Sequence, residues 1–354
     1  MERYSLDGHK LIYHVKNLSE FIQKDDCFPV YIEVSPIGSC NHRCIFCAYD
    51  YIGYPNRKLE TTRFMEVIDG LAECGVKSLL YAGEGEPLLH PEINKFIAHS
   101  RKAGIDVGIY TNGHLLKKDL AERILPFLTF IRFSFNGGNP QNYANIHSVK
   151  ENVFQKVVDN ISFCGKFRKA HNLKVDIGAQ FVLLPENVDY LIDAIKVLKE
   201  AGVDYLVIKP FVQQSLLQNY KSKNNFTLSD IENVLAQVQE YSDKSFKIIF
   251  RKNAFSNNER GYTHCYGATF ISVINSSGDV ATCLPFWDKE DFVYGNIYEN
   301  TFEKIWIGEK RKRIKEFLEN KLNAQECPPN CRPNAINEFL SEVINPTVKH
   351  INFI

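Results

Sequence analysis

Apolar and polar positions change their spacing several times between residues 30 and 211. Short apolar runs with period two predict β-strands, and longer amphipathic stretches predict helices. Pro91 at the start of one such stretch, and Gly75 and Gly104 just past the ends of two others, are typical helix boundaries. The predicted strands are Tyr31–Ser35, Ser78–Ala82, Asp106–Thr111, Phe130–Phe135, Val175–Val182 and Tyr205–Lys209, and the predicted helices are Thr62–Cys74, Pro91–Ala103, Lys118–Leu125, Lys150–Cys164 and Asp189–Ala201.

Six consecutive β/α units predict an α/β fold with a parallel sheet and right-handed crossovers. Six units are too few for a closed eight-stranded barrel, so we expect an open (β/α)6 partial TIM barrel. Function in such folds lies beyond the carboxyl ends of the strands.

Strand alternation predicts which side chains line this barrel. In the fourth strand Ile131, Phe133 and Phe135 should pack on helices, whereas the opposite face should line the interior. Hydrogen-bonded or solvated strand ends are the alternative for these inward positions, which are Glu33, Ser35, Arg132, Ser134, Asn136, Asp176, Gly178, Gln180 and Lys209.

The rest of the chain divides around the barrel. We expect an N-terminal extension (1–29), the barrel (30–212), a linker and helix (213–260), a small cysteine-rich domain (261–335) and a C-terminal tail (336–354). Ser229 and Glu232 form a capping-box pattern, with Ser229 as N-cap of a helix that runs to about Tyr241.

Composition excludes several classes of protein. The 354 residues carry no net charge, so no overall basic field draws the chain to nucleic acid. The N-terminus has no signal-peptide pattern, and no apolar run is long enough to span a membrane. Ten cysteines without a secretion signal indicate ligands or reduced thiols in a cytoplasmic protein.

Three cysteines, Cys40, Cys44 and Cys47, form a CxxxCxxC run. Three thiolates can hold three corners of a [4Fe–4S] cluster and leave one iron open to a small chelating ligand. Zinc sites usually show two separated cysteine pairs, so the triplet favours iron–sulfur chemistry over zinc or buried thiols.

This run resembles the radical S-adenosylmethionine (radical SAM) superfamily, whose fold is an open (β/α)6 barrel. The resemblance implies that the open iron binds SAM. Reduction by an external donor such as flavodoxin or ferredoxin then splits SAM into methionine and a 5′-deoxyadenosyl radical. Phe46 occupies the aromatic position that lies near the adenine in the family.

Other segments extend the resemblance. Gly85 and Glu86 match the family's Gly-Gly-Glu motif, which binds the SAM amino group, although Glu84 replaces the usual first glycine. Thr111-Asn112-Gly113 ends the third strand as in many members. Ser134 and Asn136 match positions that contact the methionine and ribose of SAM, and Asn136 stands where many relatives have Asp. Tyr143 and His147 lie in the following segment and receive no role.

A second cysteine group consists of Cys265, Cys283, Cys327 and Cys331. It resembles the C-terminal auxiliary-cluster region of SPASM and twitch radical SAM enzymes, and four cysteines imply one auxiliary [4Fe–4S] cluster. Four thiolates alone would suit zinc equally well, and the CxxxC spacing of the last pair is one residue wider than usual. His264 is expected as a neighbouring or surface residue, not a ligand.

The remaining cysteines are Cys27, Cys74 and Cys164. Cys74 and Cys164 should be small buried hydrophobes, with a hydrogen-atom donor as the alternative for any of the three.

The resemblance implies dehydrogenation of a hydroxyl on a small sugar, cyclitol or polyol, with the auxiliary cluster as electron acceptor. Lys209, at the barrel mouth, is the candidate base. Three alternatives stay open: a radical epimerase of a similar molecule, a peptide-modifying maturase, and a non-catalytic metal-binding module.

Overall fold

A ten-stranded sheet organises the computed structural model, which describes residues 9–211, 220, 226, 228–251, 260–286, 289–328 and 331–353. The strand order is β10-β9-β8-β1-β2-β3-β4-β5-β6-β7, and strands β1 to β6 pair in parallel. All six predicted strands are confirmed: β1 Tyr31–Val34, β2 Ser78–Tyr81, β3 Asp106–Thr111, β4 Phe130–Ser134, β5 Asp176–Leu183 and β6 Tyr205–Pro210.

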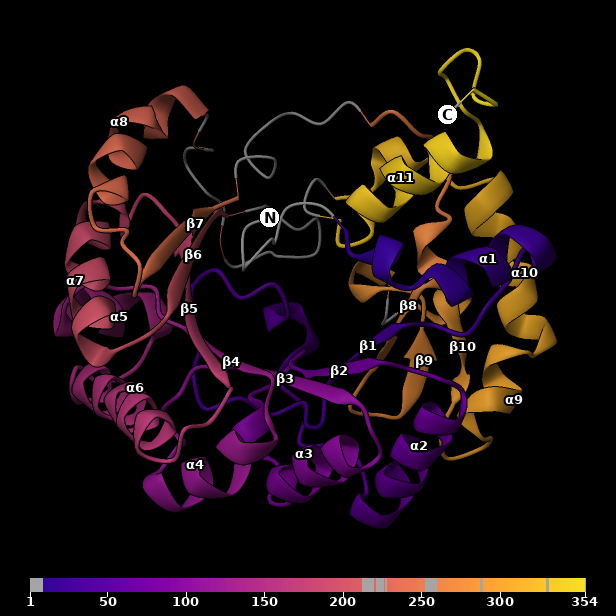
Figure 1. Ribbon diagram of the computed structural model, residues 1–354. Coiled ribbons are helices and arrows are strands. Elements are labelled where there is room, and N and C mark those ends of the chain that lie inside the picture. The colour runs from indigo at the N-terminus through magenta and orange to yellow at the C-terminus, as the bar shows by residue number, and fades with distance from the viewer. Residues whose placement is uncertain are drawn as a thin grey trace.

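Helices cover the convex side of the curved sheet (Figure 1). The five predicted helices are confirmed, although the one after β4 continues six residues beyond Cys164. The sequence analysis missed a further short helix, α5, Pro140–His147. The predicted helices are α2 Thr61–Glu73, α3 Ile93–Lys102, α4 Lys118–Ile124, α6 Asn152–Ala170 and α7 Leu191–Ala201, and 3₁₀ turns occur at Leu11–Tyr13, Asp50–Ile52, Pro87–Leu89, Leu125–Phe127, Val188–Tyr190, Gly267–Thr269, Leu284–Phe286, Glu290–Phe292 and Ala324–Glu326.

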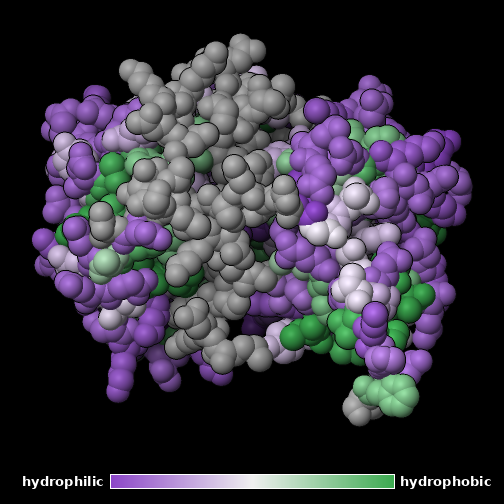
Figure 2. Space-filling view, turned by 90° about the horizontal axis from the view of Figure 1, so that it is seen from above, coloured by the Kyte–Doolittle hydropathy of each residue, from purple (hydrophilic) through white to green (hydrophobic). Residues whose placement is uncertain are grey.

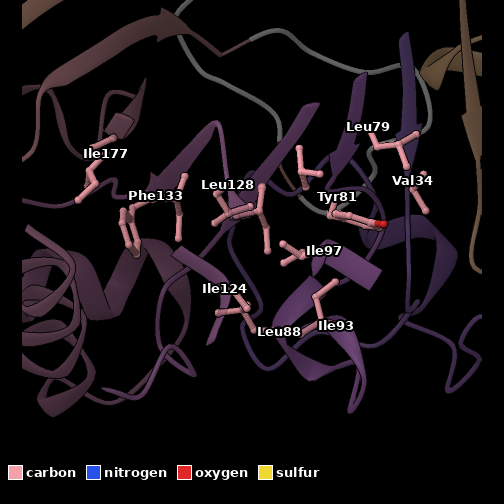
Figure 3. Packing of buried hydrophobic residues seen from close by; sticks show 14 of the residues in the cluster. Val34, Leu79, Tyr81, Leu88, Ile93, Ile97, Ile124, Leu128, Phe133 and Ile177 are labelled. Atoms are coloured by element: carbon pink, nitrogen blue, oxygen red, sulfur yellow. The ribbon is translucent and has the colours of Figure 1, made fainter. Parts of the chain in front are cut away.

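The hydrophobic core lies between these helices and the sheet (Figure 3). Ile131, Phe133 and Phe135 are fully buried in it, as strand alternation predicts. Arg132, on the opposite face, donates to the hydroxyls of Tyr110 at 2.6 Å and Tyr205 at 3.3 Å. The concave face of the barrel is therefore lined by polar side chains.

Two regions outside the six units extend the same sheet. Strand β7, Lys247–Phe250, pairs in parallel with β6 inside the segment expected to hold only a linker and a helix. Helix α8 runs from Leu228 to Gln239, so Ser229 is the second helical residue and its assignment as N-cap is wrong. Most of the predicted linker, 213–226, lies outside the described residues.

The cysteine-rich region joins the sheet on its other side. Strand β8, Ile271–Ile274, pairs in parallel with β1. Strands β9, Asp279–Ala281, and β10, Val293–Asn296, continue it antiparallel. The auxiliary-cluster region is thus built directly against the first strand of the barrel.

Helices from the two ends of the chain pack beside this extension (Figure 1). Helix α1, Val15–Lys24, shares a buried apolar cluster with α11, Asn334–Ile344, which forms the first part of the expected C-terminal tail. Helices α9, Phe302–Trp306, and α10, Glu309–Asn320, complete this side of the molecule.

Two polar contacts attach the C-terminal helices to the N-terminal extension. The Trp306 indole donates to the Cys27 carbonyl at 2.8 Å. The Arg311 guanidinium is 1% exposed and donates to both carboxylate oxygens of Asp26, at 2.6 and 2.7 Å.

Most of the described surface seen from above is hydrophilic (Figure 2). No helix among the described residues has the length and apolar character needed to cross a membrane.

The Arg311–Asp26 pair yields a stability prediction. Asp26→Asn leaves a buried guanidinium without its carboxylate and should lower the free energy of unfolding by about 3 kcal/mol. Urea unfolding measures this loss. Glu20→Gln, which breaks the exposed Glu20–Lys24 pair on α1, is the control and should cost no more than about 0.5 kcal/mol. Equal unfolding midpoints for the two variants would contradict the prediction.

Candidate active site

The cysteine triplet lies in the loop that follows β1, at the carboxyl edge of the sheet where the sequence analysis expects the site. The loop is held by backbone bonds to α5, because Arg43 N donates to the His147 carbonyl at 3.2 Å and Ile45 N donates to the Ile146 carbonyl at 3.0 Å. Cys47 N donates to the Cys44 carbonyl at 3.1 Å, which turns the chain back between the second and third thiols.

The chemistry of the three thiols fits a metal cluster. Burial, with the Glu86 carboxylate nearby, raises the pKa of Cys40 to about 12. Burial and the neighbouring thiols raise the pKa of Cys44, and burial raises that of Cys47. Only strong positive charge can hold three such groups as thiolates, and the irons of a [4Fe–4S] cluster supply it. The residues present therefore fit three ligands of that cluster.

The loop after β2 lies directly against the cysteine loop. A Cβ on Gly85 would come within 2.4 Å of the carbonyl oxygens of Ile37 and Ser39, so only glycine fits there. Glu86 N donates to the Ser39 carbonyl at 2.9 Å. Gly83, with φ of +103°, makes the turn that permits this approach.

Glu86 is a buried carboxylate that can still accept one further hydrogen bond. It accepts from the Thr111 hydroxyl at 2.6 Å, Asn112 N at 2.7 Å and Leu88 N at 3.1 Å. Burial nevertheless raises the pKa of Glu86 to about 6. A carboxylate has about four acceptor positions, so one remains for an ammonium group, the role that the sequence predicts.

Glu84, which departs from the family pattern, has a structural function. Its buried carboxylate pairs with Arg57 at 3.0 Å and accepts from Ser276 N at 2.9 Å. Arg57 Nε also donates to the Ser276 hydroxyl at 2.9 Å. Glu84 thus ties the β2 loop to the cysteine loop and to the turn between β8 and β9.

The motif that ends β3 and the polar positions of β4 face the same edge. The Asn112 side chain donates to the Asn41 side chain at 2.9 Å, which connects this motif to the cysteine loop. Ser134 is half-buried and in register with Gln180. Asn136 is buried, and its side-chain oxygen accepts from Val182 N at 2.7 Å.

Two histidines that the sequence analysis did not assign lie beside Cys44. His147 places Nδ1 3.2 Å from Cys44 Sγ, while Asn136 N donates to its Nε2 at 3.3 Å. His42 is 1% exposed, and neither of its ring nitrogens has a hydrogen-bond partner among the described residues. The sequence feature that could have identified His42 was its position between two predicted ligand cysteines.

Phe46 lies half-buried in a small apolar cluster with Ile146, Val182 and Leu184. The cluster connects the cysteine loop to α5 and to the carboxyl end of β5, so Phe46 is beside the same edge as Ser134 and Asn136.

The second cysteine group is brought together by three separate segments. Burial raises the pKa of all four thiols, to about 12 for Cys283, and neighbouring thiols raise the pKa values of Cys265, Cys283 and Cys331 further. Arg260, which the sequence analysis missed, holds the last pair by donating to the carbonyls of Cys327 at 3.1 Å and Pro328 at 2.8 Å. The Asn337 amide lies 3.4 Å from Cys265 Sγ. Four converging thiols fit a fully cysteine-bound cluster.

Arg332 connects this second group to the barrel interior. It directly follows Cys331, and its guanidinium pairs with Glu33 at 2.7 Å. Glu33 also accepts from the Tyr31 hydroxyl at 3.0 Å on the same strand. The signal that could have identified Arg332 was its place next to a predicted ligand.

Lys209 lies near the end of β6, in register with Val182. Burial, with Arg251, Arg132 and Arg332 nearby, lowers the pKa of Lys209 to about 8. A lysine with such a pKa is partly neutral near pH 7 and can act as a base.

The leftover cysteines lie away from this face. Cys164 is buried in the main core and Cys74 packs against it, whereas Cys27 belongs to the apolar cluster of α1 and α11. His264 is beside Cys265 and lines a cavity of about 270 Å³ with Arg260 and Tyr266.

Comparisons with known proteins agree with this geometry. A sequence model of the Radical SAM superfamily matches residues 34–212, and one of the SPASM iron–sulfur cluster-binding domain matches residues 265–332. A tungsten-containing aldehyde ferredoxin oxidoreductase cofactor-modifying protein of Pyrococcus furiosus is 21% identical over 83% of this chain and 84% of its own length. An Fe-coproporphyrin III synthase of Methanosarcina barkeri is 23% identical over 86% of this chain and 78% of its own length.

The fold is also that of a solved structure, Streptococcus suis SuiB bound to S-adenosylmethionine. The TM-score is 0.65 at 17% identity, and the match covers 87% of this chain and 72% of that one. SuiB was also solved with its precursor peptide SuiA.

Gly85 provides a test of how the first site is held. Gly85→Ala forces the cysteine loop away, because the added Cβ meets backbone atoms. Reconstituted Gly85→Ala should therefore lose about half of its iron, while the second site stays filled. Gly70→Ala on α2, where a Cβ meets nothing, is the control. It should keep its iron and gain about 0.5 kcal/mol of stability. Full iron content in Gly85→Ala would overturn this interpretation.

Proposed function

The chain belongs to the radical SAM superfamily, and we propose that it dehydrogenates a hydroxyl-bearing carbon of a small sugar, cyclitol or other polyol. The superfamily carries a [4Fe–4S] cluster and SAM, and the SPASM domain carries auxiliary iron–sulfur chemistry. The observation that carries the proposal is the ion pair between Arg332, next to Cys331, and Glu33 on the first barrel strand, because it brings the second cysteine group near the barrel interior, where an electron acceptor for a substrate radical would have to lie.

A cluster held by Cys40, Cys44 and Cys47 with bound SAM would, given one electron from an external donor, supply methionine and a 5′-deoxyadenosyl radical able to take one hydrogen atom from the substrate carbon. The resulting hydroxyl-bearing carbon radical becomes a carbonyl by losing one electron and one proton. The chain must therefore provide an acceptor for the electron and a base for the proton.

Lys209 is the proposed acceptor of the proton. Its ammonium form is disfavoured by burial and by three neighbouring guanidinium groups. The neutral amine can then take the hydroxyl proton as the carbonyl forms.

The second cysteine group is the proposed location of the electron acceptor. Cys265, Cys283, Cys327 and Cys331 supply four thiols, so no iron of such a cluster would be left to bind substrate. Tyr49, two residues after Cys47, has its pKa raised by burial and by Glu33, with Arg332 acting oppositely. Tyr49 is therefore close enough to the Arg332–Glu33 pair to be affected by both charges, which brings the first cysteine loop near that pair.

The charges of the interior favour a polyol that carries a phosphate or carboxylate group. Arg132 is 7% exposed, and its hydrogen-bond partners are the phenol hydroxyls of Tyr110 and Tyr205. Within the described residues no carboxylate forms an ion pair with Arg132. A buried guanidinium usually has an anionic partner, and an anionic substrate would provide it.

A peptide substrate is the second candidate, because SuiB shares the fold and was solved with a precursor peptide. A peptide is much larger than a small polyol, so the two kinds of substrate can be separated by size in an experiment.

The deciding experiment supplies fractions of native-cell extract to anaerobically reconstituted enzyme with SAM and a strong reductant. Formation of 5′-deoxyadenosine should be stimulated by the small-metabolite fraction, and stimulation should disappear after that fraction is passed over an anion exchanger. Stimulation by the macromolecular fraction alone would reject the polyol and favour a peptide. No SAM cleavage under any condition would support a non-catalytic metal-binding module.

Lys209 generates a pH prediction for the substrate found in this way. A base must be unprotonated, so product formation should rise with pH and level off above about 8, the pKa of Lys209. Lys209→Gln should still cleave SAM but form at most about one hundredth of the product. Lys247→Gln, at an exposed position on β7, is the control and should keep the wild-type profile. An unchanged profile in Lys209→Gln would exclude this lysine as the base.

A further inference from the structure

The proton of the His147 side chain can be located from its partners. The backbone N–H of Asn136 points at Nε2 from 3.3 Å, and the Asn136 side-chain nitrogen lies 3.4 Å from the same atom. The orientation of that amide is fixed, because its oxygen accepts from Val182 N at 2.7 Å. Two donors therefore converge on Nε2, which must be the acceptor, so the ring proton is on Nδ1.

The Nδ1–H group faces the sulfur of Cys44 at 3.2 Å. His147 is 0% exposed, in the last turn of α5, and its ring stacks on Tyr143 with centroids 4.1 Å apart. The His147 carbonyl accepts from Arg43 N, next to Cys44. These contacts hold both partners in place, with the imidazole fully buried and Cys44 half-buried.

A proton on Nδ1 also excludes His147 as a ligand of a single metal ion at this site. Donor atoms of His42, Cys44 and His147 lie within 4.8 Å of one another, a spacing that would suit a single metal ion. A protonated Nδ1 has no lone pair to offer, and Nε2 already accepts from Asn136. His147 is therefore a hydrogen-bond donor at this site and not a ligand.

We propose that His147 donates a hydrogen bond from Nδ1 to the Cys44 sulfur and thereby raises the reduction potential of the cluster that Cys40, Cys44 and Cys47 hold. Hydrogen bonds to cluster sulfurs stabilise the more negative, reduced state. His147 acts through Cys44 and is a positioning residue. It makes the first electron easier to accept from a biological donor, which is the step that precedes SAM cleavage.

The test is an EPR-monitored redox titration of the reconstituted full-length enzyme without SAM. The signal of the first cluster is identified as the one that changes when SAM is then added. His147→Leu should lower its midpoint potential by about 59 mV, which is a tenfold loss in the reduction equilibrium constant for one electron. His147→Asn, which can direct an amide N–H at Cys44, should recover most of the shift.

Tyr143→Phe is the matched control, because it keeps the ring that stacks on His147 and removes a hydroxyl that has no partner among the described residues. Its potential should equal that of the wild type. Equal potentials in wild type and His147→Leu would overturn the proposal, and so would an equal shift in Tyr143→Phe.

A measurement on the unmodified enzyme covers the case in which His147→Leu fails to hold the cluster. Enzyme labelled with ¹⁵N-histidine and reduced without SAM should show a weak ¹⁵N coupling in pulsed EPR, transmitted through the N–H···S bond. No coupling would refute the hydrogen bond, and a strong coupling typical of a directly bound nitrogen would refute the assigned proton position.

Discussion

The site depends on one close backbone approach, in which the loop after β2 lies against the loop that carries the first three cysteines. Gly85 leaves room for the Ile37 and Ser39 carbonyls, and Glu86 N donates to Ser39. The same glutamate receives three hydrogen bonds, two of them from the end of β3. The loops of the second and third β/α units are therefore tied by hydrogen bonds to the cysteine loop of the first. A cluster and a small chelating ligand need such a fixed frame, because open coordination is useful only when the ligand is correctly oriented.

A second constraint joins the two cysteine groups. Strand β8 pairs with β1, so the auxiliary region is part of the barrel sheet and is not a separate unit joined only by a linker. Glu84 in the β2 loop accepts a hydrogen bond from Ser276 in the turn after β8. Arg332, which follows the last cysteine of the second group, forms an ion pair with Glu33 on β1. Both contacts bury charge, which is tolerated because each carboxylate has a cation and further donors. The distance between the two groups is therefore set by the fold, as an electron acceptor near a substrate would require.

Local patterns predicted most of the fold. The six strands and five helices follow from period and from their glycine and proline boundaries, and the inward face of β4 follows from alternation. Strand β7 was missed because Lys247–Phe250 is a four-residue run that no periodicity distinguishes from a loop, and Ser229 was misplaced because helix ends vary by a residue or two. Motif spacing found the cysteines and Glu86. The contacts of Arg332, Arg260 and His147 could not be found in this way, since each joins residues far apart in the chain and no short spacing records such contacts.

Asn136 shows how a departure from a family pattern can be explained by its surroundings. The Val182 N–H requires an acceptor at this position, and the Nε2 atom of His147 requires a donor. An amide supplies both, whereas the carboxylate found in many relatives supplies acceptors only. A carboxylate would also attract the imidazole proton to Nε2 and leave the lone pair of Nδ1 facing the Cys44 sulfur. The asparagine and the histidine are therefore chemically interdependent, and the identity of residue 136 determines whether the Nδ1 atom that faces the cysteine carries the ring proton.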